Sequence, residues 1–258
     1  DRYVYAATLS RKNDRPVDKL EALLLNVGEA LCETLYANTH SVVFASATLT
    51  VDESFSAFES SLGLNTADQS RCRSCQLDSS YDYDGQRGSM LTLFTNRREM
   101  ENCFEAVQPA LKSDDLRLVC QKWGVSVKGL RDDFLADEHL SLFALKSFWE
   151  GFDAPGATLK GVVIPKLPFS KPTDPLSCER ATRDDQAWRR YVLPAAVLET
   201  KQAAGRLIRK ADDSGVLILT DRRLITKGYG KAFLNSLPSR TIKICSTADI
   251  VAELAQRV

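Results

Sequence analysis

The chain has 258 residues, and its 34 Lys and Arg side chains balance 34 Asp and Glu side chains, so the formal net charge at pH 7 is zero. This balance excludes a polybasic protein that binds nucleic acid through bulk charge, so any such contact must come from locally placed side chains. A hydrophobic content of 44%, with 13 Gly and 9 Pro, excludes a disordered or collagen-like chain. We expect a globular chain with one large or two unequal domains.

The N-terminal third predicts a helix, a strand and a connector. Residues 17–36 repeat leucines at helical spacing, which predicts an amphipathic helix. Residues 41–44 are apolar and partly β-branched, which predicts a buried strand that ends in the small-residue run of residues 45–50. Residues 66–89 are polar with little periodicity, which indicates a connector around a domain boundary.

From Met90 onward, short apolar runs alternate with helical patterns. The expected strands are 91–94, 116–120, 140–145, 161–164, 216–219 and 241–245. The expected helices are 98–112, 129–137, 191–208, 230–236 and 248–257. This alternation predicts an α/β fold, a doubly wound, mostly parallel sheet with helices on both faces. In such sheets ligands bind beyond the carboxyl ends of the strands, so the loops after strands are the candidate sites.

Two of these loops combine polar side chains with a strand end. Thr95 and Asn96 follow the first strand and lead into Arg97 and Arg98, a combination that suits a phosphate at a helix N-terminus. An ordinary Thr or Asn helix cap is the alternative. The loop 146–156 places a tryptophan and two carboxylates around a glycine, which indicates either ligand binding or a plain turn with solvated acids.

The other two loops are a proline-rich segment and a run with two arginines. Residues 165–175 carry four prolines and must be stiff and extended, which suits a binding groove or a surface connector. In the expected helix 191–208 and just beyond it, Arg206 and Arg209 lie at i and i+3, with Gln202 on the same face. This face suits a triphosphate, and a salt-bridged surface is the alternative. Gly205 costs ~1 kcal/mol in a helix, which suggests a close approach to the backbone.

Five sequence runs, taken in order, resemble the C-terminal half of DinG-like DNA helicases, which are superfamily two relatives of the XPD-type repair helicases. These runs are SVVFASATLT, LTLFTN, SFWEGFDAPG, KLPFSKPTDPL and QAAGRLIRKADDSGVLILTDRR. The similarity extends from about residue 41 to about residue 240. It implies that residues 67–258 form the second RecA-like lobe of a two-lobe motor. Residues 1–66 would then be a remnant of the first lobe and a connector.

The resemblance also implies the roles of individual residues. Motif III, which couples ATP hydrolysis to strand movement, corresponds to Ser46, Ala47 and Thr48. Single-stranded DNA would contact motifs IV and V through Thr95, Asn96, Ser147 and Trp149. Trp149 could instead be a core anchor. ATP would contact Glu150, Gly151, Asp153 and Gly205, and motif VI would supply Gln202, Arg206 and Arg209 as catalytic residues.

Other parts of a helicase are absent from the sequence. It contains neither a G-x-x-x-x-G-K-[ST] phosphate loop nor a DEAH-type acidic run, so the first lobe of the parent must supply these groups for ATP and Mg²⁺. Many family members hold an iron–sulfur cluster in that lobe. Here Cys72 and Cys75 form a lone C-x-x-C, and we predict no metal in this segment. His40 and His139 belong to no motif, and we assign neither a catalytic role.

The sequence thus predicts the second lobe of a helicase, with single-stranded DNA and the first lobe of the same parent as its partners. A RecA-like docking module without catalysis is the alternative. No apolar run approaches the ~20 residues that cross a bilayer, so we expect no membrane contact. We also expect the segment to be monomeric. The chain begins with Asp1 and has no methionine before Met90, which indicates a segment of a longer protein. Seven cysteines, an odd number, favour a reducing, cytoplasmic compartment.

Overall fold

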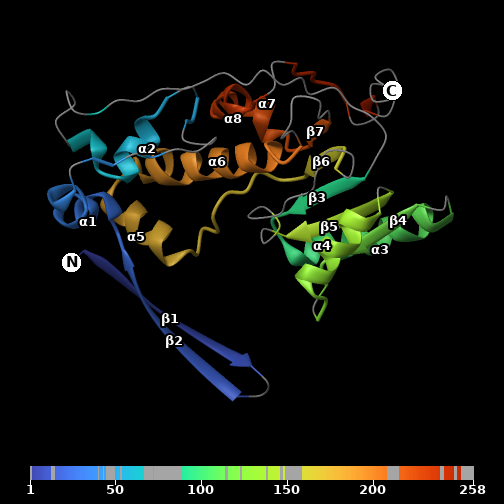
Figure 1. The fold of residues 1–258 in the computed structure, drawn as a ribbon, viewed down its shortest axis with the longest axis horizontal. Coiled ribbons are helices and arrows are strands. Elements are labelled where there is room, and N and C mark those ends of the chain that lie inside the picture. The colour runs from blue at the N-terminus through green and yellow to red at the C-terminus, as the bar shows by residue number, and fades with distance from the viewer. Residues whose placement is uncertain are drawn as a thin grey trace. The chain divides into compact units, whose positions relative to one another are not determined.

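The chain divides into two compact units, each with its own secondary structure. Unit 1 comprises Asp1–Gln76 and Phe169–Leu198, and unit 2 comprises Leu77–Pro168 and Glu199–Val258. The computed structural model, drawn in Figure 1, describes residues 2–12, 15–39, 41–42, 44, 50–52, 54–66, 72, 89–113, 116–122, 124–137, 139–145, 148, 159–207, 215–238, 241–246 and 249–250. Residues 169–198 thus group with the N-terminal part, although the sequence placed the domain boundary near residue 66. The assignment of residues 1–66 to a first lobe stays a prediction.

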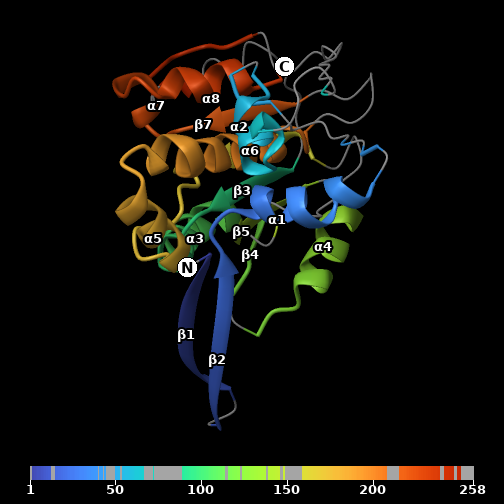
Figure 2. The same ribbon diagram turned by 90° about the vertical axis from the view of Figure 1, so that its left-hand side faces the viewer.

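Unit 1 begins with a long antiparallel hairpin, which Figure 2 shows most clearly. Strand β1 (Tyr3–Lys12) pairs with β2 (Arg15–Leu24) along its whole length. The expected helix over 17–36 is therefore wrong in its first half. The leucines of this segment fit helical spacing, but ladder pairing with β1 decides the conformation, a tertiary effect that local periodicity does not report. Helix α1 (Val27–Thr34) starts only after Asn26, its N-cap, whose side chain accepts a hydrogen bond from the Gly28 N–H at 3.0 Å.

The other described elements of unit 1 are short helices and the first half of α6 (Leu193–Ala204). The short helices are α1 (Val27–Thr34), α2 (Ser56–Ser61), α5 (Pro175–Arg183), a π-helical turn at Trp188–Val192, and 3₁₀ turns at Tyr36–Asn38 and Leu64–Thr66. Helix α5 lies at the end of the proline-rich loop, which was expected to be extended. The start of α5 has the usual features of a helix N-terminus. The N-cap residue Asp174 accepts a hydrogen bond from the Ser177 N–H at 2.8 Å, and Pro175 occupies the first turn.

The strand expected over residues 41–44 does not form at the described positions. Ser41, Val42 and Phe44 are irregular, and Val42 and Phe44 are each 37% exposed. A buried strand needs a neighbouring strand to satisfy its backbone groups. The described part of the chain offers residues 41–44 no such partner, which accounts for the wrong prediction.

Unit 2 is built on a five-stranded, all-parallel sheet with the order β4-β5-β3-β6-β7. The strands are β3 (Met90–Phe94), β4 (Arg117–Cys120), β5 (Leu140–Leu145), β6 (Gly161–Ile164) and β7 (Val216–Leu219). These five strands were expected within a residue or so, and the predicted α/β parallel sheet is confirmed. Their continuous apolar character reflects burial on both faces of the sheet.

Helices cover both faces of this sheet. The helices of this unit are α3 (Arg97–Ser113), α4 (Val127–Ala136), the C-terminal part of α6 (Leu193–Ala204), α7 (Arg223–Thr226) and α8 (Gly230–Ser236). Leu91 and Leu93 of β3 point into a core cluster with Phe134 of α4 and Ala203 of α6. Phe94 belongs to a second cluster, with Met100 of α3 and Cys120 of β4. The alternation along β3 therefore places α3 and α4 on opposite faces.

The last expected strand, 241–245, is irregular in the structure. Strand β7 and residues 241–246 both line a cavity of about 480 Å³, so this segment faces β7 across a space and forms no ladder with it. Ile242 and Ile244 are 47% and 66% exposed. The helix expected over 248–257 lies almost wholly outside the described residues.

The order of the strands creates a point where connections diverge. Strands β3 and β6 are neighbours, but the chain leaves β3 toward β4 on one side of the sheet and leaves β6 toward β7 on the other. In open α/β sheets ligands bind beyond the carboxyl ends of the strands at such a switch point. The loops after β3 and β6 are therefore the candidate ligand-binding loops of this sheet.

No helix within the described ranges is both long and apolar enough to span a bilayer. Among the described glycines of unit 2, Gly230 at the start of α8 leaves the least room for a side chain. A Cβ added there would lie 1.9 Å from the Leu224 carbonyl oxygen, which belongs to the backbone of α7.

We expect Gly230→Ala to lower the free energy of unfolding by about 1–3 kcal/mol, because the backbone of α7 must move to admit the methyl group. Urea denaturation followed by circular dichroism measures this change. Gly228→Ala is the matched control, since a Cβ at Gly228 meets no atom of the described residues within 4 Å. Equal effects of the two substitutions would contradict this account of the α7–α8 packing.

Candidate functional site

The loop after β3 begins with Thr95 and Asn96, both exposed. Asn96 Oδ1 accepts hydrogen bonds from the Arg98 N–H at 2.9 Å and the Glu99 N–H at 3.4 Å. The helix-cap interpretation of Asn96 is therefore confirmed. Contact of Thr95 and Asn96 with nucleic acid stays a prediction.

The loops after β4 and β5 are joined to α3 through Gln121, a buried residue that the sequence interpretation missed. Its Oε1 accepts from the Leu145 N–H at 2.9 Å, at the end of β5. Its backbone carbonyl accepts from Arg97 Nη1 at 2.9 Å, in the first turn of α3. One amide side chain and one guanidinium thus fix the ends of β4 and β5 against the start of α3.

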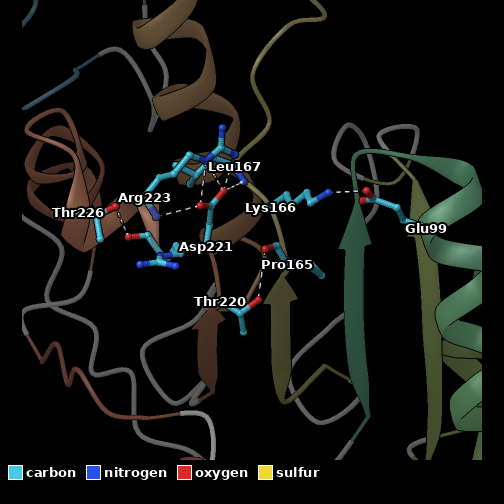
Figure 3. A network of polar contacts seen from close by, with 9 residues as sticks. Glu99, Pro165, Lys166, Leu167, Thr220, Asp221, Arg223 and Thr226 are labelled. Carbon is cyan, nitrogen blue, oxygen red and sulfur yellow. Dashed lines mark hydrogen bonds and ion pairs between the residues drawn. The ribbon is translucent and has the colours of Figure 1, made fainter.

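The loops after β6 and β7 are joined by the Asp221 carboxylate, which Figure 3 shows at the centre of its hydrogen bonds. Asp221 accepts from the Leu167 N–H at 3.0 Å, from the Arg223 N–H at 3.0 Å and from Arg223 Nε at 2.9 and 3.0 Å. The Asp221 side chain is only 7% exposed. A buried carboxylate is stable there because it receives several charge-assisted or backbone hydrogen bonds.

These contacts determine the ionisation of Asp221. Burial by itself raises the pKa of the carboxyl, but hydrogen bonds from the Arg223 side chain and from the Leu167 and Arg223 N–H groups outweigh burial. The pKa of Asp221 falls from its usual 3.8 to about 2. The same pairing raises the pKa of Arg223, chiefly through its hydrogen bond to Asp221.

Lys166 lies between Pro165 and Leu167, the two residues through which the end of β7 holds the loop after β6. The hydroxyl of Thr220 donates to the Pro165 carbonyl at 3.2 Å, and Asp221 receives the Leu167 N–H. The Lys166 side chain extends away from these contacts, and its Nζ pairs with the carboxylate of Glu99 in the first turn of α3 (Figure 3). The sequence interpretation assigned no role to Lys166, Glu99 or Asp221, although KLPF and TDRR both stood in the runs that it singled out.

The described part of the motif VI run, residues 202–207, leaves the helix after Ala204. Helix α6 ends at Ala204, and the Arg206 N–H donates to the Ala203 carbonyl at 3.2 Å in a tighter turn. Gln202 therefore lies in the helix and Arg206 in the turn that follows it, and the predicted common face of Gln202, Arg206 and Arg209 stays a prediction. Gln202 is exposed, and Arg206 is half-buried with its Nε inaccessible to solvent. Arg209 lies outside the described residues.

Gly205 is exposed in this turn. A Cβ at Gly205 would lie 3.4 Å from the Lys201 carbonyl oxygen, the nearest atom found among the described residues. That distance is an ordinary contact. Internal packing of the described residues therefore does not account for the glycine, and the expected close approach to this backbone stays a prediction.

Several predicted site residues lie outside the described ranges. They are Ser46, Ala47 and Thr48 of motif III, Ser147, Trp149, Glu150, Gly151 and Asp153 of motif V, and Arg209 of motif VI. Within motif V the structure describes Phe148, which is fully buried, with Arg131 5.3 Å from its ring centroid. Among the residues whose positions are given, no three His, Cys, Asp or Glu side chains group as a metal site.

Comparisons with known proteins agree on one family. Residues 83–240 match the model of the helicase C-terminal domain. The chain is 34% identical over 248 residues to the ATP-dependent DNA helicase YoaA of Escherichia coli, a match that covers 83% of this chain and 38% of that protein. It is 30% identical over 271 residues to the 3'-5' exonuclease DinG of Bacillus subtilis, covering 90% of this chain and 29% of the relative. The chain thus spans about a third of the length of these relatives.

A solved structure, S. tokodaii Xpd4, covers 54% of the chain at 15% identity with a TM-score of 0.33. The assignment of the fold rests on the topology of the parallel sheet and not on this similarity.

We expect the stability of unit 2 to depend on pH through Asp221. Because its pKa is lower in the folded state, its stabilising contribution is present above about pH 4 and is lost as the pH falls toward 2. The loss amounts to about 2 kcal/mol in the free energy of unfolding. Urea denaturation at a series of pH values measures it for the wild type and for Asp221→Asn, which should be less stable at pH 7 and lose less stability on acidification.

Asp133→Asn is the matched control, because Asp133 is an exposed residue of α4 in the same unit. Its pH profile should follow that of the wild type. A wild-type profile that is flat between pH 4 and pH 2 would contradict the role of Asp221.

Proposed function

Because the chain belongs to the helicase C-terminal domain family, we propose that it is the second motor lobe of an ATP-dependent DNA helicase. The observation that carries this proposal is the family match over residues 83–240, which extends from just before β3 to beyond α8. In this role the parent protein translocates on single-stranded DNA and unwinds duplexes. The printed name of the E. coli relative, an ATP-dependent DNA helicase, supports the activity class.

Arg206 and Arg209 contact the triphosphate of an ATP molecule held by the first lobe of the parent. A guanidinium has the planar fork that binds phosphate oxygens in pairs, and it stabilises the charge that develops on the γ-phosphate during transfer. The half-buried position of Arg206, with its Nε shielded from water, supports this role, because a shielded guanidinium interacts more strongly with an anion. Gln202, Gly205, Glu150, Gly151 and Asp153 complete the side of the nucleotide site that this lobe contributes.

Single-stranded DNA follows the carboxyl edge of the sheet, past Thr95 and Asn96 and the motif V residues Ser147 and Trp149. The cap of α3 uses Asn96 Oδ1 as an acceptor, and the N–H groups of the same amide suit a phosphate oxygen. The motif III residues Ser46, Ala47 and Thr48 link ATP hydrolysis to movement of the strand. ATP favours the closed arrangement of the two lobes and its hydrolysis releases it, which produces a step along the DNA.

Mg²⁺ and the phosphate loop belong to the first lobe in this proposal, and an iron–sulfur cluster, where the parent has one, belongs there as well. The only carboxylates of this lobe assigned to the nucleotide site, Glu150 and Asp153, lie outside the described residues. No step of the proposed mechanism is therefore assigned to a metal ligand of this chain.

We expect the 258-residue chain alone to show no ATP hydrolysis above background, with or without single-stranded DNA, because the groups that hold the β- and γ-phosphates are missing from its sequence. A phosphate-release assay with purified chain measures this rate. DNA-stimulated turnover by the chain would contradict the division of the ATP site between two lobes.

In a parent protein that carries both lobes, we expect Arg206→Ala or Arg209→Ala to lower DNA-stimulated ATP turnover by about 10³- to 10⁵-fold, the range measured for arginine fingers. The melting temperature should stay nearly unchanged. Lysine at either position should not restore turnover, because an ammonium lacks the planar fork.

Arg117→Ala is the matched control for this experiment. Arg117 is an exposed arginine at the start of β4, paired with Asp137. Its removal should leave turnover close to that of the wild type. Near-normal turnover in both the Arg206→Ala and the Arg209→Ala protein would show that the motif VI arginines do not act on ATP.

A further inference from the structure

The backbone of Lys166 is held on both sides by the end of β7. Thr220 binds the carbonyl of the preceding residue, Pro165, at 3.2 Å, and Asp221 binds the N–H of the following residue, Leu167, at 3.0 Å. The side chain of Asp221 is itself shielded from solvent and is fixed by Arg223. None of these contacts uses the Lys166 side chain, so the loop presents a cation from a fixed backbone (Figure 3).

The ammonium group of Lys166 faces α3, where it pairs with Glu99. The two side chains are 54% and 44% exposed. An ion pair this exposed contributes only about 0–1 kcal/mol to stability and is easily exchanged for another partner. Asp221 stabilises the fold and accounts for the fixed backbone of this loop, whereas the stability of the fold does not account for the Lys166–Glu99 pair.

The position of this ion pair coincides with the switch point of the sheet. Lys166 follows β6 and Glu99 follows β3, the neighbouring strands whose connections leave in opposite directions. Ligands bind at such points in open α/β sheets. Glu99 also lies less than one helical turn beyond Asn96, so the pair adjoins the loop proposed to contact single-stranded DNA.

We infer that Lys166 binds a backbone phosphate of single-stranded DNA, and that Glu99 is the internal counter-ion that the phosphate replaces. This inference rests on the proposed function and adds a binding residue to it. Because the chain has no net charge, it depends on locally placed cations to hold a polyanion. Glu99 keeps Lys166 paired in the absence of DNA and repels the incoming phosphate, so its charge lowers the affinity while that of Lys166 raises it.

The two charges therefore predict opposite effects of substitution. We expect Lys166→Gln to weaken binding of a fluorescein-labelled oligothymidylate by about two- to fivefold at low salt, the equivalent of one exposed ion pair. The slope of log K against log salt should become shallower by about 0.7, the value for one phosphate contact on a single strand. Lys166→Arg should keep the slope of the wild type. Glu99→Gln should tighten binding by a similar factor.

The experiment uses fluorescence anisotropy with the complete 258-residue chain at several salt concentrations. Lys112→Gln and Glu105→Gln are matched controls, because both side chains are exposed on α3 and lie farther along that helix than Glu99. Each control makes the same charge change at a position away from the switch point. Each should therefore change the affinity for the oligothymidylate and its salt dependence less than the corresponding substitution at Lys166 or Glu99 does. In the Lys166→Gln background, Glu99→Gln should lose most of its effect, since the two residues act on one phosphate.

Two negative results would have different meanings. If the wild-type chain binds oligothymidylate and Lys166→Gln changes neither affinity nor slope, the inference about Lys166 is wrong and the DNA track lies elsewhere on the lobe. If the wild-type chain shows no salt-dependent binding of single-stranded DNA at all, the proposed DNA track fails, and the role of Lys166 fails with it. Circular dichroism of each variant confirms that the exposed substitutions leave the fold intact.

Discussion

A buried carboxylate at the end of β7 holds together the part of the sheet to which we assign function. Asp221 receives the Leu167 N–H and the Arg223 side chain, and it thereby ties the loop after β6 to the loop after β7. Parallel strands need this kind of contact, because all their carboxyl ends meet at one edge and each leaves polar backbone groups there. With that loop fixed, the position of Lys166 relative to α3 follows from the sheet itself.

The same edge is linked by polar contacts from β4 to β7. Gln121 and Arg97 join the ends of β4 and β5 to the first turn of α3, and Glu99 and Lys166 join α3 to the loop after β6. The buried contacts of Gln121 and Asp221 give rigidity, whereas the exposed pair at the centre gives little stability and exchanges its partner readily. A chain without net charge must bind a polyanion through locally placed cations. Here the rigid contacts of Gln121 and Asp221 surround Lys166, a cation that can exchange Glu99 for a phosphate.

Two errors of the sequence interpretation share one physical cause. Residues 17–24 have leucines at helical spacing, yet they form β2 because β1 supplies a ladder partner. Residues 241–246 alternate like a strand, yet they face β7 across a cavity. In both cases the local pattern fits, and the presence or absence of a neighbouring backbone decides the conformation. The end of α6 at Ala204 has a different cause, because spacing alone does not show where a helix stops.

The sequence by itself determined the alternation of apolar strands and helices from Met90 to Ser236, and with it the parallel sheet, because burial on both faces imposes continuous apolar runs. It also identified the family through motifs whose order is independent of folding. Only the tertiary structure decided which polar residues meet. Asp221 and Leu167 are 54 positions apart, and Lys166 and Glu99 are 67 positions apart. The strand order places β6 beside both β3 and β7, and no local pattern in the chain encodes that neighbourhood.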